Sequence, residues 1–370
     1  MSDLLNNELQ RLRTQRGWTQ QELADRASLS RQSIVAIEAG KMTPSVAIAL
    51  RLSAALGRPV DALFWLDANA AQVRVRRAAG DADAVRLAAA VVAGQWVAHP
   101  MPPDDADSWS QGADALQVSA VDEDGTALAE LLRSAEVLRE TWLVSGCDPA
   151  LALLAAHARE RQPECRLVAI QATSGAALRH LADGLVHLAG SHVRDPATGE
   201  FNAPAIRARL PGRRVMLFNV ARWDLGIVVA SGNPLHVRSV VDLAQPNVRL
   251  VQRSADAAAQ LVLEQQLAQT GLSKPARTVT AGSHRGVAQL IALGSADAGI
   301  ATVHAARTFG LEFQPLEESR FDLAVPVELA ATPRFARILE VLESRAFQRE
   351  LSALQGYGLE DSGQLMAEVG

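Results

Sequence analysis

Four short segments of this chain combine small hydroxyl-bearing residues with the start of a helical pattern. They cover residues 145–149, 173–175, 253–256 and 282–285, and the first follows an apolar run that is typical of a strand. Free amides at a helix N-terminus, together with serine and threonine hydroxyls, form a site that accepts anions. If the four turns converge on one cleft, they suit a tetrahedral oxyanion or a small carboxylate or amine compound. The candidate ligand-binding residues in these turns are Ser145, Cys147, Asp148, Thr173, Ser174, Arg253, Ser254, Asp256, Ser283, His284 and Arg285.

Cys147 and two histidines carry side chains with further chemistry. The pKa of a thiol tends to fall at a helix N-terminus, so Cys147 either reacts with an oxidant, an electrophile or a sulfur species, or fills space as a partly buried thiol. His192 and His284 offer nitrogen ligands, but no spacing of further ligands accompanies them, which favours packing over a metal site. An enzyme with Cys147 as nucleophile and His284 as base lacks a matching Cys–His–acid signature. We therefore expect no catalytic residues, no metal ligands and no cofactor, and a protein that is not an enzyme.

The composition limits the classes to which this chain can belong. Its 370 residues suit two or three domains, and 48% apolar with 21% charged residues is normal for a soluble globular protein. The polar N-terminus lacks the apolar core of a signal peptide, and the longest apolar runs are far shorter than the roughly 20 residues of a membrane span. The two cysteines, Cys147 and Cys165, make no disulfide framework. These features predict a cytoplasmic protein without a membrane partner.

The first 65 residues have the pattern of five short helices. Thr19 and Glu22 form a capping box before the second helix, and Ser30 caps the third. A last helical turn is predicted over residues 59–66. The first 65 residues carry eight basic and six acidic side chains, whereas residues 66–142 carry six and thirteen. Contact with a polyanion is therefore expected at the N-terminus.

The rest of the chain divides into a small strand-rich segment and a long alternating one. Residues 67–140 predict a strand-containing connector, interrupted at 100–112 by a loop or linker rich in Pro, Asp and Ser. From residue 141 onward, short apolar runs alternate with helical patterns, which argues for α/β architecture with a parallel sheet. Separate strands are expected at residues 215–219 and 226–230. The predicted domains are residues 1–66, 67–140 and 141–360.

Two helical patterns near the N-terminus carry a known motif. It reads Thr19-Gln20-Gln21-Glu22-Leu23-Ala24, then Ser30-Arg31-Gln32-Ser33-Ile34 and Ile37-Glu38-Ala39-Gly40. The motif resembles the phage-repressor (Xre) helix-turn-helix family, which implies that the third helix enters the major groove of double-stranded DNA. Carried over position by position, the resemblance assigns base contacts to Arg31, Gln32 and Ser33, and phosphate contacts to Gln20, Lys41 and Thr43. Ser28 departs from the family, which often has glycine at this turn, because a left-handed backbone is less favourable for serine.

The alternating segment carries a second resemblance. Its motifs are Ser145-Gly146-Cys147-Asp148-Pro149-Ala150-Leu151, Ala189-Gly190-Ser191-His192, Thr198-Gly199-Glu200-Phe201-Asn202, Ser231-Gly232-Asn233-Pro234 and Ala296-Asp297-Ala298-Gly299-Ile300. In this order they resemble the periplasmic-binding-protein-like domain of a family often described as molybdate-binding-like regulators, in which it is fused to helix-turn-helix modules. The resemblance implies a type 2 fold, with two α/β lobes and a ligand between them.

One turn departs from this second family. Relatives usually carry a Gly-Ser-Gly-Thr-Arg-like run where this chain has Ser254-Ala255-Asp256-Ala257-Ala258. Two unit charges at roughly 4 Å and an effective dielectric constant of about 20 repel by about 4 kcal/mol, so Asp256 disfavours an anion in the cleft. Either the ligand is a zwitterion or a neutral polar compound rather than molybdate, or Asp256 is a first-turn residue favoured by the helix dipole.

These motifs predict a multidomain protein with an all-α helix-turn-helix head, a small strand-containing connector and a two-lobed α/β periplasmic-binding-protein-like (type 2) domain. The predicted function is a ligand-responsive transcription regulator. Its expected partners are a double-stranded DNA operator and a small effector, an oxyanion or a small polar metabolite. We expect a homodimer or higher homo-oligomer, because such motifs read two half-sites about one DNA turn apart. Two alternatives stay open: a thiol-based sensor that uses Cys147, and a DNA-binding assembly protein without a small-molecule effector.

Overall fold

The computed structural model describes residues 5–66, 71–101, 111–162, 164–272 and 277–370. The chain divides into two compact units, Met1–Gln72 and Val73–Gly370, and each is described by itself. Most of the loop expected at residues 100–112 lies outside the described residues. Within the described ranges, no helix combines the length and the apolar character needed to cross a membrane.

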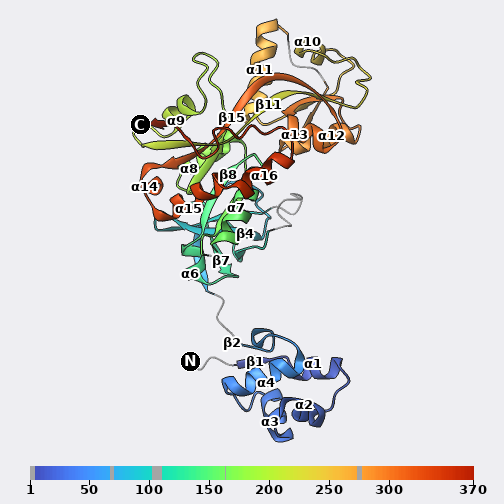
Figure 1. The fold of residues 1–370 in the computed structure, drawn as a ribbon, viewed down its shortest axis with the longest axis vertical. Helices are drawn as coiled ribbons and strands as arrows, with labels where there is room; N and C mark the ends of the chain where they lie inside the picture. Colours follow the sequence, from blue (N-terminus) through green and yellow to red (C-terminus); the bar gives the residue numbers. More distant parts are fainter. Residues whose placement is uncertain (1–4, 67–70, 102–110, 163, 273–276) are drawn as a thin grey trace. The chain divides into compact units, whose positions relative to one another are not determined.

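The first unit packs four helices around one apolar core (Figure 1). Its elements are β1 (Leu5–Asn7), α1 (Leu9–Gln15), α2 (Gln20–Ala27), α3 (Arg31–Glu38), α4 (Val46–Leu56), the 3₁₀ turn Val60–Ala62 and β2 (Phe64–Leu66). The last helical turn expected over residues 59–66 is therefore only partly helical. Its final residues pair with β1 in an antiparallel ribbon, with Leu5 opposite Leu66, because this pairing satisfies backbone groups of both segments.

The second unit begins with a closed five-stranded barrel. Its strands are β3 (Gln72–Arg77), β4 (Arg86–Val92), β5 (Gln95–Pro100), β6 (Ala115–Gln117) and β7 (Thr126–Leu131), in the order β3-β5-β4-β6-β7. The small apolar interior contains alanines from β4, β5, β6 and β7 together with Val75 and Leu87. The sequence analysis did not predict β7. The short helix α6 (Ala135–Arg139) follows the barrel.

The rest of the second unit, after the barrel and α6, forms two lobes. They share one nine-stranded sheet, and each lobe has its own helices. The path through eight of its strands is β13-β12-β14-β11-β15-β10-β8-β9, with β16 (Leu365–Val369) paired to β11. The first lobe comprises β8 (Trp142–Gly146), α7 (Ala150–Arg161), β9 (Leu167–Gln171), α8 (Ser174–Ala182), β10 (Leu188–Ser191) and α9 (Ala203–Arg209). The second comprises α10 (Val240–Leu243), β12 (Leu250–Gln252), α11 (Ala258–Thr270), β13 (Thr278–Thr280), α12 (His284–Ala292), β14 (Ala298–Thr302) and α13 (Val303–Thr308).

Two long antiparallel strands run through both lobes (Figure 1). They are β11 (Val215–Val229) and β15 (Glu312–Pro326). The two strands expected at residues 215–219 and 226–230 are thus one, because pairing with β15 continues through the polar residues between them, with only local register shifts. Helices α14 (Val327–Ala330), α15 (Pro333–Leu342) and α16 (Arg345–Ala353) follow β15, and α15 and α16 pack on α7.

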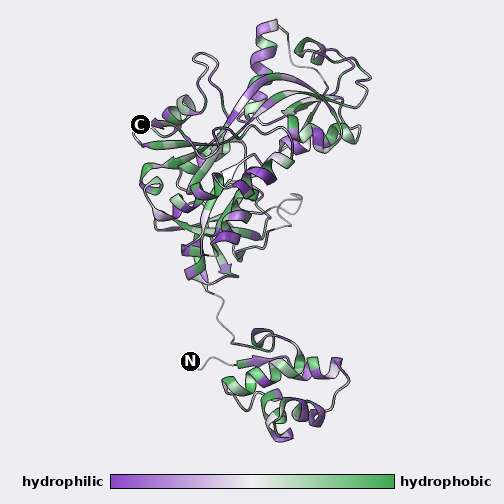
Figure 2. Cartoon of the chain, viewed as in Figure 1, coloured by the Kyte–Doolittle hydropathy of each residue, from purple (hydrophilic) through white to green (hydrophobic). Residues whose placement is uncertain are grey.

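Hydrophobic residues are frequent along the strands of the sheet, whereas the helices mix hydrophobic and hydrophilic residues (Figure 2). The parallel strands β8 and β10 are buried along their whole length, which is why they read as continuous apolar runs, whereas the edge strand β9 is partly exposed toward its end. In such a sheet the carboxyl ends of the strands open into loops that lead to helix N-termini. Both lobes present these ends to the region between them, and this arrangement positions the candidate site.

Candidate functional site

The helix-turn-helix segment is formed by α2 and α3, and the observed caps match the sequence pattern. Thr19 Oγ1 accepts a hydrogen bond from the Glu22 amide at 3.2 Å, and Glu22 Oε2 accepts one from the Thr19 amide at 2.7 Å. Ser30 Oγ accepts a bond from the Ser33 amide at 3.0 Å. Ser28, between the helices, has a φ of 54°. The turn therefore has the left-handed backbone that favours glycine, and serine adopts it here.

One face of α3 and the loop after it is open to solvent. Arg31 and Gln32 are exposed, and so are Lys41 and Thr43. Val35 is 42% exposed and lies one turn after Arg31 on the same face. The sequence analysis did not single out Val35, because an apolar residue in a helical pattern predicts a core position. An exposed apolar side chain at this place suits contact with a thymine methyl group.

The other two residues assigned to DNA make contacts within the protein. Gln20 Nε2 donates to Glu38 Oε2 at 3.0 Å, and the same carboxylate pairs with Arg13 at 2.6 Å. Ser33 Oγ lies 2.8 Å from Ser30 Oγ. Gln20 therefore ties the start of α2 to the end of α3, which fixes the angle between the two helices.

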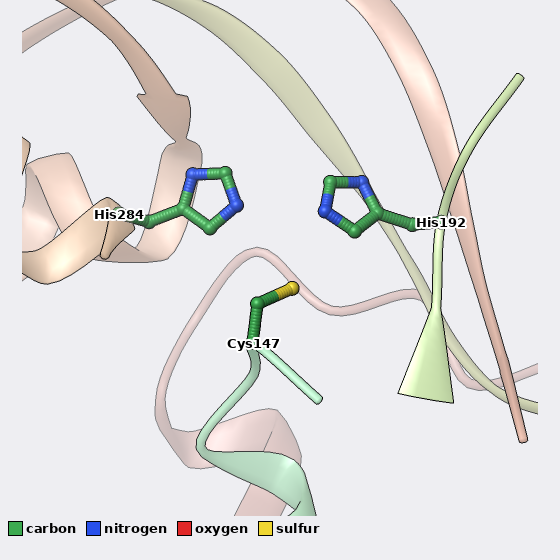
Figure 3. A group of neighbouring side chains, drawn as sticks. All are labelled: Cys147, His192 and His284. Atoms are coloured by element: carbon green, nitrogen blue, oxygen red, sulfur yellow. The ribbon is translucent and has the colours of Figure 1, made fainter. Parts of the chain in front are cut away.

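The region between the lobes contains a buried cluster of one thiol and two imidazoles (Figure 3). Cys147 follows β8 and His192 follows β10 in the first lobe, whereas His284 is the first residue of α12 in the second. One ligand atom of each side chain lies within 4.8 Å of the others, and the residues are 4%, 2% and 4% exposed. Figure 3 shows that each ring turns a nitrogen toward the other ring, with the sulfur between them.

Burial sets the protonation state of this cluster. It lowers the pKa of His192 to about 4 and the pKa of His284 well below its usual value, so both rings are neutral near pH 7. His192 Nδ1 lies 2.9 Å from Ser319 Oγ, which leaves Nε2 for the cluster. Burial also raises the pKa of the Cys147 thiol to about 12. The expectation of a lowered thiol pKa at this turn is wrong, because desolvation of the thiolate outweighs the effect of the helix N-terminus.

Arg253 places a cation beside the cluster. The residue is 6% exposed, and its Nη2 donates to the carbonyl of Gly282 at 3.0 Å. Its Nε and Nη1 are buried and have no hydrogen-bond partner among the residues that the structure describes. Its positive charge acts to lower the pKa of Cys147, His192 and His284. Apart from the bond to Gly282, this cation makes no ion pair or side-chain hydrogen bond with the described residues. A buried charge that is only partly satisfied is destabilising by several kcal/mol, so an anion bound at Nε and Nη1 would reduce that cost.

Asp256 does not act as an unpaired charge in the cleft. Its carboxylate is bonded to the guanidinium of Arg179 in α8 and accepts a bond from Ser254 Oγ at 2.8 Å. Although burial opposes the shift, bonds to Arg179, Ser254 and Thr173 lower the pKa of Asp256. Arg179 compensates the charge of Asp256, which weakens the alternative in which Asp256 repels an anion. Among the residues that the structure describes, the buried charge without an ion-pair partner at this boundary is instead the cation of Arg253.

The two lobes touch where Asp256 meets the start of α8. The Gly175 amide donates to the Asp256 carbonyl at 3.1 Å, and the Arg179–Asp256 ion pair spans the same boundary. A Cβ atom at Gly175 would lie 2.7 Å from both the Cβ and the carbonyl oxygen of Asp256. Only glycine permits this approach, so the structure represents a closed arrangement of the lobes.

Further buried polar and aromatic residues surround the cluster, and all except Asp148 lie outside the four turns. Asp148 Oδ1 accepts a bond from Tyr357 Oη at 3.0 Å, and Asp148 Oδ2 lies 3.3 Å from His304 Nε2. The His304 and Tyr357 rings stack at 4.4 Å, and Trp223 packs edge-on against both. The buried Ser191 Oγ has no partner within the described chain. Of these residues, only Asp148 is among the candidates from the sequence, because Ser191 and Trp223 come from strands, His304 from helix α13 and Tyr357 from the C-terminal segment, none of which carries a turn motif.

Of the remaining residues assigned to the ligand, Ser174 contacts the cluster, whereas the others make contacts outside it. Ser145 Oγ bonds to His180 Nδ1 at 3.0 Å, and Ser174 Oγ accepts a bond from the His192 amide at 3.2 Å. Thr173 and Ser283 cap α8 and α12. Ser254 is exposed, and the exposed Arg285 lies over the Phe309 ring. The structure thus brings together Cys147, Asp148, Ser174, Arg253 and His284.

A cavity of about 580 Å³ adjoins the cluster on the side of the barrel. The barrel contributes Asp81 and His99 to its wall, and the two lobes contribute Asp148, His180 and Ser283. The cluster itself is closed from solvent, whereas this cavity is open. Asp148 lines this cavity and is the chain neighbour of Cys147, so the cavity adjoins the first turn of the site.

Comparisons with known proteins agree with this architecture. A model of the PBP superfamily domain matches residues 155–343, and a helix-turn-helix model matches residues 9–63. The uncharacterized protein YvgK of Bacillus subtilis (strain 168) is 28% identical over 236 residues, which cover 62% of this chain and 75% of that protein. An uncharacterized HTH-type transcriptional regulator of Methanothermobacter thermautotrophicus is 43% identical over 61 residues, which cover 16% of this chain and 88% of that protein.

A solved structure is similar at lower identity. The regulatory domain of MetR, a LysR family regulator from N. meningitidis, matches with a TM-score of 0.43 at 11% identity, over 59% of this chain and 97% of that one. The matched families are regulators and binding proteins rather than enzymes. The superfamily model spans 189 of the 370 residues, and the chain therefore belongs to the PBP superfamily, as a DNA-binding transcription regulator with an Xre-type helix-turn-helix head fused to a two-lobed ligand-binding domain.

Proposed function

We propose that this regulator responds to a small anionic ligand, an oxyanion or a small carboxylate, that binds between the lobes and pairs with Arg253. One observation carries the proposal: the guanidinium is buried, and within the described chain its Nε and Nη1 have no partner. The planar fork of arginine matches carboxylate and oxyanion geometry with paired hydrogen bonds. The buried Ser191 hydroxyl, which also lacks a partner among the described residues, is suited to supply a further bond.

Ligand binding reaches the DNA through closure of the lobes. Cys147 and Ser191 belong to the first lobe and Arg253 to the second, so a ligand that contacts both favours the closed state. Strands β11 and β15 connect the lobes and serve as the hinge. On the DNA side, Arg31, Gln32 and Ser33 contact bases, and Gln20, Lys41 and Thr43 contact phosphates. The exposure of Arg31, Gln32, Lys41 and Thr43 supports this assignment.

The active form in this proposal is a homodimer or higher homo-oligomer, because helix-turn-helix proteins read two half-sites about one DNA turn apart. Light scattering coupled to size-exclusion chromatography measures this directly. A monomer that binds a single half-site with full affinity would contradict it.

The ligand assignment is tested by calorimetry on the full chain. Native mass spectrometry of freshly purified protein identifies any retained anion, and that anion is titrated beside molybdate, sulfate, phosphate and succinate. For an anion that binds, Arg253→Gln should weaken affinity by about 2–5 kcal/mol, the usual effect of removing one partner of a buried charge pair. Arg249→Gln is the matched control, since Arg249 pairs with Asp297 at the other end of β12.

Two outcomes would contradict the proposal. One is an anion that binds tightly to the wild type and equally to Arg253→Gln. The other is operator binding, measured by fluorescence anisotropy, that stays unchanged at saturating anion. The second outcome would favour an assembly protein without a small-molecule effector. The thiol-sensor alternative has less support, since burial raises the pKa of Cys147 and suppresses its thiolate.

A further inference from the structure

We propose that Cys147, His192 and His284 form a site for a borderline or soft transition-metal ion, such as Zn²⁺ or Cu⁺, that joins the two lobes. The proposal goes beyond the anionic effector and does not require it. Sequence alone argued against such a site, because the three residues lie 45 and 92 positions apart and form no ligand spacing. Only the fold brings them together, at the carboxyl ends of strands from different lobes.

The geometry is close to that of a tetrahedral site. Bond lengths of about 2.0–2.1 Å to nitrogen and about 2.3 Å to sulfur place the ligand atoms of a zinc site roughly 3.4–3.6 Å apart. The three atoms here lie within 4.8 Å of one another. Coordination therefore needs a contraction of about 1.4 Å at most (4.8 minus 3.4), which is within reach of side-chain rotation. His284 Nδ1 has no partner among the described residues, so no hydrogen bond at that atom prevents its ring from turning.

The donor set selects the class of metal. One sulfur and two imidazole nitrogens suit zinc, copper, cobalt and nickel, whereas Mg²⁺ and Ca²⁺ require oxygen ligands. Each ring turns a nitrogen toward the other ring, so both imidazoles can direct a lone pair into the site. His192 also has the support that metal-bound histidines usually have, since its Nδ1 is hydrogen-bonded to Ser319 Oγ and its Nε2 is turned to the cluster.

The charges around the cluster define what completes the coordination. When the metal binds, the Cys147 thiol releases its proton to solvent. A divalent ion with the resulting thiolate has a net charge of +1, and Arg253 adds another positive charge nearby. Asp148, which is buried and accepts a hydrogen bond from Tyr357, compensates one of these two positive charges. An anion that acts as the fourth metal ligand and lies against Nε and Nη1 of Arg253 compensates the second positive charge. This last step rests on the proposed function, and it predicts that metal and anion each increase the affinity for the other.

Cobalt is the spectroscopic probe for the test. The full-length protein is stripped with a chelator and titrated with Co²⁺ under reducing conditions, and then with Zn²⁺ in competition. We expect one equivalent of Co²⁺, a thiolate-to-cobalt charge-transfer band, and displacement by Zn²⁺ but not by Mg²⁺. X-ray absorption of the zinc-loaded wild type should show one sulfur and two imidazoles, which identifies the site without any substitution.

Substitutions locate the site. Cys147→Ser should abolish the charge-transfer band, and His192→Gln or His284→Gln should weaken Zn²⁺ binding by at least about 100-fold, since loss of even a supporting residue costs 10–100-fold. Cys165→Ser and His236→Gln are matched controls that keep wild-type binding, because Cys165 lies outside the cluster and His236 is exposed. Circular dichroism confirms that each variant is folded.

Three results would overturn the metal site: no stoichiometric Co²⁺ or Zn²⁺ binding by the wild type, an absorption spectrum without sulfur, or an unchanged band in Cys147→Ser. The experiment also separates this proposal from the proposed function. Metal binding without any effect of Arg253→Gln on anion affinity would refute the anion site alone. Anion binding that depends on Arg253, with no metal bound, would refute the metal site alone.

Discussion

Gly175→Ala is expected to hold the two lobes apart while leaving each lobe intact. The residue lies in the first turn of α8, where alanine is a better helix former than glycine by about 0.5–1 kcal/mol. Its new Cβ atom would lie 2.7 Å from Asp256, and ordinary contact begins near 3.4 Å, so Asp256 must retreat by at least 0.7 Å (3.4 minus 2.7). The bond from the residue 175 amide to the Asp256 carbonyl is then stretched beyond 3.1 Å.

The size of the effect follows from this clash. Overpacking of a close contact usually costs about 1–3 kcal/mol, which here falls on the closed state only. The population of open molecules should therefore rise by roughly 5–150-fold. The ion pair of Arg179 with Asp256 is half exposed on the arginine side, so it opposes opening only weakly.

Alkylation of Cys147 measures opening without any knowledge of the ligand. The thiol is 4% exposed in the closed state, and His284 of the second lobe covers it, so labelling requires the lobes to separate. Peptide mass spectrometry of the labelled protein should show Cys147 reacting roughly 5–150-fold faster in Gly175→Ala, with the rate at Cys165 unchanged. Gly286→Ala is the control, since its Cβ would meet its nearest neighbours at 3.4 and 3.5 Å. Equal Cys147 rates in the wild type and Gly175→Ala would refute the reasoning.

Three further predictions concern the head and the barrel. Arg31→Ala should weaken operator binding by about 1–3 kcal/mol and relax the preference at one base position. Lys41→Ala should instead weaken binding to all sequences and make the salt dependence of affinity shallower by about one unit of slope. Fluorescence anisotropy on specific and random DNA measures both effects, and equal losses for both variants on both DNAs would contradict the assignment. Glu38→Ala should lower the free energy of unfolding of the head by about 3 kcal/mol in urea denaturation, because it leaves the largely buried Arg13 without its ion-pair partner. A loss below about 1 kcal/mol would show that the Arg13–Glu38 pair is solvated. Burial lowers the pKa of His99 to about 4, below its value of about 6.5 in the unfolded chain. Between these two pH values the unfolded chain binds a proton that the folded chain does not, so the free energy of unfolding decreases as the pH falls through this range. Urea denaturation at pH 7 and pH 5 should therefore show a smaller pH dependence in His99→Gln, and an unchanged dependence would place the cause in another group.

The sequence by itself determined the features that depend on residues close together in the chain. The caps at Thr19 and Ser30 involve partners only three residues away, and the apolar positions of α1–α4 follow from helical spacing. The alternation of strands and helices after residue 141 fixed the α/β class for the same reason. It also placed four polar turns at helix N-termini, because a strand that leads into a helix exposes free amides there.

Only the tertiary structure decided which side chains meet and in which charge state. The thiol pKa of Cys147 rises instead of falling because two lobes exclude water from it, and the charge of Asp256 is compensated because Arg179 reaches it from the other lobe. Burial and ion pairing act between residues that lie far apart in the sequence, so no local pattern encodes them. For the same reason His192 and His284 each predicted packing when taken alone, whereas the closed lobes bring both within 4.8 Å of one sulfur atom.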